Sequence, residues 1–432
     1  MIQYACRKNR GSYFRISLMA LGALLIAGLC QPASAATLCV NSGGTSGCYP
    51  TIKAAVAASS DNDTIQVAPG IYKEDVVIGH PLSLVGANAS NTIIDATGFA
   101  NGIYVDGIDN NGLKNVVVTG FTVENADFEG ILVTNASSVT VQNNQVVNND
   151  KSLDITTFTC PGIPSFETAE GEDCGEGIHI IGVDYSVVAG NTSENNSGGI
   201  LISDETAATH DNLITGNVFR NNPFDCGIVM ASHPAASGFG SGSPFGIYHN
   251  TIANNDSIHN GYQVPGAGAG VGIFTFLPGG TVTGNVVIDN VLTDNGLPGV
   301  AMHAHSPGEN LNDNVIVGNQ ISGNGADTED AATPGPTGIN VYGLSPIMGT
   351  VIAQNVIKHE AVGVAVKTGA QVDVHLNNLL GQGAVGVDNH GSGVVNATEN
   401  WWGCSSGAGA AGCSSVSGSG VLTTPSLAVP VH

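Results

Sequence analysis

The stretch "NVIVGNQISGNG" (residues 314–325) places an asparagine at every fifth position, at Asn314, Asn319 and Asn324. These offsets fit neither the 3.6-residue period of an amphipathic helix nor the alternation of a simple hairpin. Short apolar runs, rich in the β-branched residues that favour strands, lie between the asparagines. The pattern therefore indicates short strands separated by regularly placed corners.

The same arrangement repeats along most of the chain. A Gly-led motif, Gly-(Ile/Val)-x-(apolar), returns every 22 to 28 residues where nothing interrupts it, and an asparagine that opens a further strand follows downstream. This spacing is typical of a solenoid. The motif glycines are Gly102, Gly130, Gly177, Gly199, Gly227, Gly272, Gly299, Gly338, Gly363 and Gly386. The matching asparagines are Asn144, Asn191, Asn217, Asn250, Asn290, Asn319, Asn355, Asn378 and Asn400.

Three short strands per repeat, joined without helices and turning the same way, predict an all-β fold, a right-handed parallel β-helix of about ten coils. Equal positions of neighbouring coils then stack in columns about 4.8 Å apart. We interpret the asparagines as architectural. Asparagine tolerates the left-handed backbone of a sharp corner, and its amide group donates to one neighbouring coil and accepts from the other.

The composition agrees with this fold and predicts export. The 432 residues include 60 Gly and are 42% hydrophobic but only 5% aromatic. Four basic residues precede a 14-residue apolar run and the tripeptide "ASA", so residues 1–35 are predicted to be a cleavable secretory signal. Seven basic and 35 acidic residues remain after its removal, a net charge of −28. We therefore expect a secreted or periplasmic bacterial monomer with no membrane span and no nucleic-acid partner.

Both ends of the solenoid need covers, because a sheet edge left open invites aggregation. Residues 36–60 are predicted to form a cap with a short helix in "TIKAAVAASS" (residues 51–60), and residues 61–403 the β-helix. Trp401 and Trp402 close the last coil, and a Ser/Gly-rich tail follows at 404–432. Three close cysteine pairs suit an oxidising compartment and leave Cys226 over. The expected pairs are Cys39 with Cys48, Cys160 with Cys174 and Cys404 with Cys413.

The opening segment from Thr51, the Gly-led repeats and the closing "NWWG" resemble the right-handed β-helix proteins of the pectate-lyase-like superfamily. The repeat pattern is most similar to the proteins grouped with the periplasmic copper-binding accessory factor of nitrous oxide reductase maturation. The resemblance covers roughly residues 51–403. It implies the fold strongly and the function weakly, because this superfamily includes lyases, hydrolases, esterases, epimerases and adhesins.

Long insertions interrupt the repeat before Gly177, Gly272 and Gly338, and loops of this length are often functional. We expect them to wall a groove over the Gly-led strands, the sheet over which substrate commonly lies in the enzymes that the chain resembles. Residues at the second and fourth positions after each glycine should face this groove. The fourth positions of the later coils form one predicted column of Phe276, His303, Tyr342, Lys367 and His390, and the second positions add Phe274, Asn340 and Asp388.

This predicted strip suits a sugar, which needs flat apolar contact and directed hydrogen bonds. His303, Lys367 and Asp388 are the candidate acids or bases. The alternative is that these residues are ordinary solvent-facing side chains.

A second candidate group lies nearer the N-terminus. Glu129 and Glu176 precede the glycines of consecutive coils, so their carboxylates should stack about 5 Å apart, a separation that retaining glycosidases use. His179 lies close by in the sequence. The adjoining acidic insertion, with Glu167, Glu170, Glu172 and Asp173, suggests a Ca²⁺ site built from Glu172, Asp173 and Glu176, the alternative being a solvated loop without an ion.

Copper is a further hypothesis. Met302, His303 and His305, with Met230 and His233, offer the thioether and imidazole groups that copper binds. Both methionines fall on the inward phase, however, where methionine is more often core filler.

We predict from these observations a protein that binds or processes a carbohydrate polymer. If it is an enzyme, it is similar to a polysaccharide lyase or a glycoside hydrolase. A lyase acting on uronates is disfavoured by the acidic charge and by the single Arg220 of the mature chain. The rival hypotheses are a non-catalytic cell-surface scaffold or adhesion protein and a periplasmic copper accessory protein.

Overall fold

The computed structural model describes residues 35–431 apart from 169–173, 265–266 and 382. The predicted signal at residues 1–35 therefore lies almost entirely outside the described residues, as do Glu172 and Asp173. No helix in the described part of the chain is long and apolar enough to cross a membrane.

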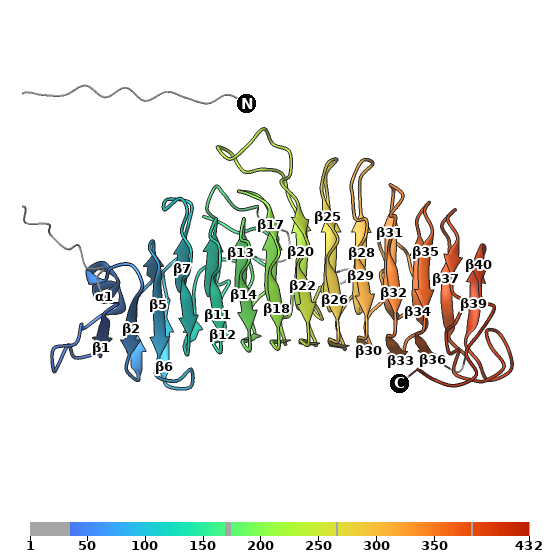
Figure 1. Cartoon of the computed structure of the whole chain (residues 1–432), viewed down its shortest axis with the longest axis horizontal. Coiled ribbons are helices and arrows are strands. Elements are labelled where there is room, and N and C mark those ends of the chain that lie inside the picture. The colour runs from blue at the N-terminus through green and yellow to red at the C-terminus, as the bar shows by residue number, and fades with distance from the viewer. Residues whose placement is uncertain (1–34, 169–173, 265–266, 382, 432) are drawn as a thin grey trace, which may run out of the picture. The chain divides into compact units, whose positions relative to one another are not determined.

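The described residues from Ala35 onward form a right-handed parallel β-helix, which confirms the predicted fold (Figure 1). All the strand pairings in its sheets are parallel, and every coil except those at the two ends contributes one strand to each of three long sheets. Within a coil the chain runs from the Gly-led sheet to the fourteen-strand sheet and then to the eleven-strand sheet. The Gly-led sheet contains β4 (Val76–Ile78), β7 (Ile103–Asp106), β10 (Ile131–Thr134), β13 (Ile178–Ile181), β16 (Ile200–Ser203), β20 (Ile228–Ser232), β24 (Val271–Thr275), β28 (Val300–Ala304), β31 (Thr337–Gly343), β34 (Val362–Lys367), β37 (Val385–Asn389) and β39 (Ser415–Gly418).

The other sheets complete the walls of the solenoid. The fourteen-strand sheet contains β1 (Thr37–Val40), β2 (Asp63–Val67), β5 (Leu82–Gly86), β8 (Val117–Thr119), β11 (Thr140–Gln142), β14 (Val187–Ala189), β18 (Leu213–Thr215), β22 (Thr251–Ala253), β26 (Val286–Ile288), β29 (Val315–Val317), β32 (Val351–Ala353), β35 (Val372–His375), β38 (Val395–Asn396) and β40 (Val421–Leu422). The eleven-strand sheet contains β3 (Gly70–Tyr72), β6 (Thr92–Asp95), β9 (Thr122–Glu124), β12 (Gln145–Val147), β15 (Thr192–Glu194), β19 (Val218–Arg220), β23 (Asp256–Ile258), β27 (Val291–Thr293), β30 (Gln320–Ser322), β33 (Val356–Lys358) and β36 (Asn378–Leu380). A small sheet joins β17 (Thr209–His210), β21 (Ile247–Tyr248) and β25 (Val282–Thr283).

The two faces of the Gly-led sheet are both covered, unlike those of its neighbours. Strands of the fourteen- and eleven-strand sheets alternate between buried and partly exposed residues, whereas most Gly-led strands from β10 to β31 are buried at nearly every position. The inward side chains join the main core. On the outer face, beneath the insertions, lies a second apolar cluster of Leu201, Cys226, Val229, Ala231, Ala269, Phe274, Leu297 and Ala301.

The corner asparagines form ladders that run from coil to coil, which confirms their architectural role. Asn255 is typical: its side-chain amide donates to Asn290 Oδ1 at 3.0 Å and to the Ile214 carbonyl at 2.9 Å, and its Oδ1 accepts from the backbone and side-chain N–H groups of Asn217. The first ladder, between the fourteen- and eleven-strand sheets, joins Asn144, Asn191, Asn217, Asn255, Asn290, Asn319, Asn355, Asn377 and Asn400.

Two details of the asparagine prediction are wrong. Asn255 and Asn377 take the ladder positions assigned to Asn250 and Asn378, because Asn250 belongs to a second ladder with Asn212, Asn285 and Asn314 at the entry to the fourteen-strand sheet. A third ladder follows the eleven-strand sheet and joins Asn149, Asn196, Asn222, Asn260, Asn295 and Asn324 to Glu360. The second error concerns the backbone. The left-handed conformation is adopted by the residue before each first-ladder asparagine, such as Asn254 (φ 55°) or Gly318 (φ 71°), and not by the asparagine itself.

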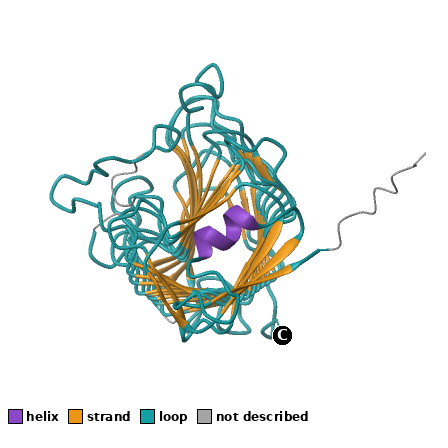
Figure 2. Cartoon of the chain, turned by 90° about the vertical axis from the view of Figure 1, so that its left-hand side faces the viewer, coloured by secondary structure: helices purple, strands orange, loops and turns teal. Residues whose placement is uncertain are grey.

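The ends of the solenoid agree with the sequence analysis in part. Helix α1 (Ile52–Ala58), capped by the Thr51 side chain, buries one face and covers the interior of the first coils (Figure 2). Trp402 is fully buried in the last coils. The chain does not end there as a tail, because β39 and β40 pair with β37 and β38 and extend two sheets. The three expected disulfides are present, and Cys226 is a buried free thiol.

Candidate functional site

The outer face of the Gly-led sheet brings most of the predicted strip together, with one error of register. Val271 pairs with Val300, so the coil begins at Gly270 and not at Gly272. Phe274, and not Phe276, therefore lies beside His303, which is followed by Tyr342 and Lys367 in the next two strands. Phe276 lies in a neighbouring stack of rings with His233 and His305.

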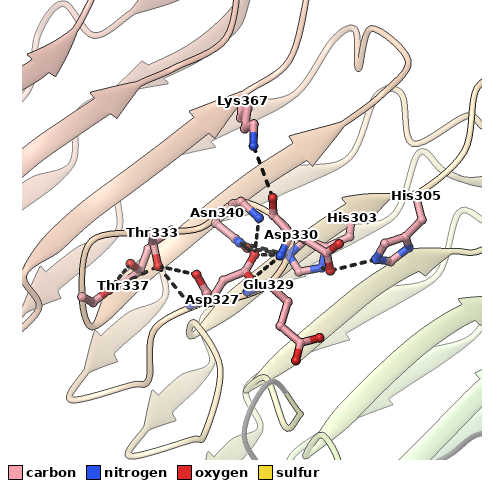
Figure 3. A network of polar contacts seen from close by, with 11 residues as sticks. His303, His305, Asp327, Glu329, Asp330, Thr333, Thr337, Asn340 and Lys367 are labelled. Carbon is pink, nitrogen blue, oxygen red and sulfur yellow. Dashed lines mark hydrogen bonds and ion pairs between the residues drawn. The ribbon is translucent and has the colours of Figure 1, made fainter.

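His303 lies at the centre of a polar network, the histidine–aspartate cluster, formed by His303, His305, Asp327, Asp330 and Asn340 (Figure 3). His303 Nε2 lies 3.2 Å from Asp327 Oδ2, and its Nδ1 lies 3.4 Å from Asp330 Oδ2. His305 Nε2 lies 3.0 Å from the same Asp330 oxygen. Two imidazole rings of one strand thus meet one carboxylate of the insertion above them.

The local structure explains why these groups meet. Along β28 alternate residues face outward, so Met302 enters the core while His303 points to the insertion at residues 325–336. The Asp327 carboxylate fixes this insertion by accepting the backbone N–H groups of Glu329, Asp330 and Ala331. Asn340 Nδ2 donates to Asp327 Oδ2 at 2.7 Å, which ties the turn to β31.

The two aspartates make His303 a stable cation. Burial alone would lower the pKa of His303, but hydrogen bonds to Asp327 and Asp330 outweigh it and raise the pKa to about 8. Burial would raise the pKa of Asp327, but the hydrogen bond and the charge of the His303 ring outweigh burial and lower this pKa to about 2. Hydrogen bonds from His303 and His305 hold the pKa of Asp330 well below its usual range. At neutral pH the cluster therefore holds two carboxylates and at least one imidazolium.

This pairing predicts a stability that falls as the pH rises. The pKa of His303 is raised in the folded state from 6.5 to about 8, so its contribution is fully present below about pH 6.5 and is lost as the pH passes about 8. A shift of this size corresponds to about 2 kcal/mol. Urea unfolding at pH 6.5 and pH 9 should show this loss in the wild type.

The matched pair of variants isolates the histidine. Buried carboxyls with raised pKa values, such as Asp150 at about 8, add a fall in the same direction. The His303→Asn variant should therefore lose about 2 kcal/mol less between the two pH values than the exposed control His249→Asn. Equal losses in the two variants would contradict the assignment.

The predicted catalytic trio of His303, Lys367 and Asp388 is not a single cluster. Asp388 lies on β37, three strands from β28, which is about 14 Å at the spacing of strands in a sheet. Asp388 is buried 3.1 Å from His390, whose side chain is largely exposed. Lys367 instead lies over the Tyr342 ring and donates to the backbone carbonyl of Asp330. The distances therefore exclude joint acid–base work by these three residues in this structure.

A pocket of about 320 Å³ opens beside the cluster. Its walls come from the sheet, from the turns before the Gly-led strands and from the insertion. They include Phe274, Phe276, Leu297, His303, His305, Glu329 and Asp330. A larger hollow of about 610 Å³ near the C-terminus is lined mainly by Gly and Ala, with His359 and Glu360. The first pocket is the better site, because it combines aromatic faces with converging charged groups.

The second predicted pair is closed to solvent. Glu129 and Glu176 are both fully buried, and the Glu176 carboxylate lies against Gly198 of the next coil. Glu129 Oε1 lies 3.3 Å from His179 Nδ1, and Glu167 of the insertion completes this group. A sugar has no access to either glutamate in this structure, so the predicted glycosidase pair is not supported.

The copper hypothesis loses its sulfur ligands. Met230 and Met302 are fully buried members of the main core, so both thioethers point away from the histidines of the outer face. His303, His305 and Asp330 remain as one group whose ligand atoms lie within 4.8 Å of one another.

Several residues of these polar groups could not be identified from the sequence. Asp327 and Asp330 belong to an insertion, where no repeat phase tells which side chain faces the sheet. Glu205, which binds His233 at 2.8 Å, lies just after the Gly-led strand β16. The only available signal was the length of the insertions, which predicted their place but not their contacts.

Comparisons with known proteins agree with this architecture. Residues 54–273, just over half of the 432-residue chain, match the family model described as Periplasmic copper-binding protein (NosD). No curated protein sequence matches the chain. The Dettilon tailspike protein (gp208) is 14% identical with a TM-score of 0.54, over 84% of this chain and 68% of that one.

Two further solved structures share the fold. DFA-IIIase from Arthrobacter chlorophenolicus A6, in complex with GF2, is 14% identical with a TM-score of 0.50, over 79% of this chain and 84% of that one. Geobacillus virus E2 ORF18 has the same identity and TM-score over 77% of this chain, which spans only 57% of that protein's length. At such identities these likenesses show the fold alone, whereas the family match covers the repeats themselves. The chain therefore belongs to the NosD family.

Proposed function

We propose that this protein binds and processes a carbohydrate polymer along the outer face of the Gly-led sheet, over β20 to β34. The observation that carries the proposal is a row of stacked rings. The Phe276 ring lies parallel to that of His305, with centroids 5.0 Å apart, and nearly parallel to that of His233 at 6.1 Å. Phe274, His303 and Tyr342 follow in the adjacent column.

This row has the two properties that sugar recognition needs. Phe276 is 42% exposed, and because its ring lies between those of His233 and His305, its open edge supplies the apolar surface that a pyranose ring can contact. The half-buried Asp330 and His305 lie at the same pocket and supply directed hydrogen bonds. The shared fold of the tailspike protein and DFA-IIIase supports a role of this kind.

Within the proposed site the two histidines take different roles. His305 and Asp330 line the pocket and are partly exposed, so they are the candidate acid–base pair. His303 is buried behind them, and its positive charge positions the Asp330 carboxylate. Burial would lower the pKa of His305, but hydrogen bonds to Asp330 and to the Thr275 carbonyl raise it, which favours the role of proton donor to a leaving group.

The proposal predicts that Phe276→Ala weakens glycan binding by about tenfold, because one ring–sugar contact contributes about 1.4 kcal/mol. The matched control is Tyr185→Ala, since Tyr185 is 62% exposed and lies away from the Gly-led sheet. Retention on neutral and acidic polysaccharide gels measures binding, and new reducing ends measure cleavage. His305→Gln should keep binding and lose cleavage.

Two results would overturn this function. Equal retention of Phe276→Ala and the wild type would remove the row of rings from the site. Absence of binding to every polysaccharide, with an intact fold, would favour the scaffold hypothesis.

One observation favours a second candidate function, metal handling as the family description implies. His303 Nδ1, His305 Nε2 and Asp330 Oδ2 converge, and two imidazoles with one carboxylate suit Cu²⁺. They do not suit Cu⁺, because both candidate thioethers are buried in the core. Bound copper would supply a Lewis acid at the pocket. The three residues would hold it, and copper would have to displace the protons that the histidines share with Asp330.

A further inference from the structure

A second polar group lies at the opposite end of the apolar outer cluster, where the first insertion meets the sheet. Glu129 precedes β10, His179 lies on β13, and Glu167 comes from the insertion that the disulfide between Cys160 and Cys174 closes. All three side chains are at most 1% exposed. Their ligand atoms lie within 4.8 Å of one another. The three residues, here called the Glu–Glu–His group, therefore join the insertion to the sheet.

Three of the four carboxyl oxygens of this group have no hydrogen-bond donor among the described residues, whereas Glu129 Oε1 pairs with His179. Glu129 Oε2 and both oxygens of Glu167 are buried and make no hydrogen bond with the described residues. A buried oxygen without a donor carries an energetic cost, which is larger when the oxygen is charged. A cation between these oxygens would remove this cost.

The contacts around His179 determine which of its nitrogens faces the glutamates with a lone pair. Burial would raise the pKa of Glu205, but the adjacent His233 lowers it to about 2, so this carboxylate only accepts hydrogen bonds. The Ser203 hydroxyl donates to Glu205 and is left to accept from His179 Nε2, 2.8 Å away. In the tautomer with its proton on Nε2, His179 turns the Nδ1 lone pair toward Glu129 and Glu167. This is the arrangement by which outer partners orient a metal-binding histidine.

The spacing of the donor atoms also fits a metal. His179 Nδ1 lies 3.3 Å from Glu129 Oε1 and 3.7 Å from Glu167 Oε2. These distances are long for charge-assisted hydrogen bonds, which measure about 2.7–2.9 Å. Ligands about 2.1 Å from a tetrahedral Zn²⁺ lie about 3.4 Å from one another. Both His179 distances are therefore close to that spacing, and the ligand atoms of the three residues all lie within 4.8 Å of one another.

We propose that Glu129, Glu167 and His179 bind one divalent transition-metal ion of the Zn²⁺ or Mn²⁺ class. One imidazole with two carboxylates is the donor set of these ions. Ca²⁺ takes six to eight oxygens, whereas the two glutamates supply at most four. The site is distinct from the predicted Ca²⁺ site, whose residues Glu172 and Asp173 lie outside the described part of the chain.

The place of this ion defines its role. The group is closed to solvent, and Gly175 (φ 102°) leaves no room for a Cβ beside Glu129 Oε1. The ion is therefore structural. It fastens the disulfide-closed insertion to β10 and β13.

Calorimetric titration of chelator-treated full-length protein with Zn²⁺, and separately with Mn²⁺, tests the proposal, with native mass spectrometry to count the ions. We expect one tight equivalent and a higher melting temperature. Glu167→Gln should weaken this binding at least 100-fold while the metal-free protein melts no lower than the metal-free wild type, because a buried acid has been replaced by an amide. Ser203→Ala, which frees His179 Nε2, should weaken binding by about 10–100-fold.

The matched control separates this site from the histidine–aspartate cluster. His305→Gln removes a ligand from that cluster and should keep the tight equivalent. Loss of the ion in His305→Gln with retention in Glu167→Gln would overturn the proposal, and so would a wild type that binds neither ion. X-ray absorption of the Zn²⁺-loaded wild type decides the question without variants. One imidazole among oxygen ligands supports the site, and two imidazoles or any sulfur ligand contradict it.

Discussion

Replacing Asn255 with alanine is expected to lower the free energy of unfolding by about 3–5 kcal/mol, because four side-chain hydrogen bonds of the first ladder disappear at once. The backbone N–H of Asn217 and the carbonyl of Ile214 stay buried without these partners. Urea unfolding followed by far-ultraviolet circular dichroism measures the loss.

The residue before it provides the matched control. Asn254 is exposed and has a φ of 55°, a conformation that glycine adopts without strain, so Asn254→Gly should change stability by less than about 1 kcal/mol. If the two substitutions cost the same, the ladder contributes nothing beyond the turn itself.

Replacing Asp327 with alanine is expected to cost about 3–5 kcal/mol, because it leaves the buried His303 cation without its nearest counter-ion. The substitution also removes the acceptor for three backbone N–H groups of the insertion. The His303 pKa should fall from about 8, which a histidine titration by nuclear magnetic resonance measures directly.

The control lies two residues away in the same turn. Glu329 is exposed and carries the same charge, so Glu329→Ala should change stability by about 0.5 kcal/mol or less. Asp327→Asn keeps an acceptor for the backbone but removes the charge, and it should lie between the two. An Asp327→Ala variant as stable as Glu329→Ala would show that the cluster does not depend on the ion pair.

The periodic parts of the chain were predictable from the sequence, because a repeat constrains every copy at once. The parallel coils, the cap helix and the three cysteine pairs all follow from spacing. The errors occur where two residues fit the same pattern. Gly270 and Gly272 are both followed by Val or Ile, as the motif requires, and Asn250 and Asn255 both precede a strand. Only the strand register decides between them.

The candidate site was harder to predict, because half of it lies outside the repeat. Phe274, His303, Asn340 and Tyr342 could be placed by their phase in the sheet. Asp327, Asp330 and Glu167 come from insertions, and their partners are set by three-dimensional folding that no period encodes. The burial of Asp388 and Glu129 was missed for the same reason, since the loops that cover them have no regular pattern.

The third ladder ends at Glu360, whose Oε1 accepts both the backbone and the side-chain N–H of Asn324. A carboxyl group at this position accepts hydrogen bonds but has no side-chain N–H group with which to donate to the next coil. The interior coils, by contrast, present the same donors and acceptors to both neighbours. Such a chain can grow by duplication of an internal segment, for example one running from one first-ladder asparagine to the next, with every inserted amide finding a partner. A duplication that copied Glu360 would interrupt the third ladder in the middle of the solenoid. Natural length variants should therefore gain their extra coils before this residue.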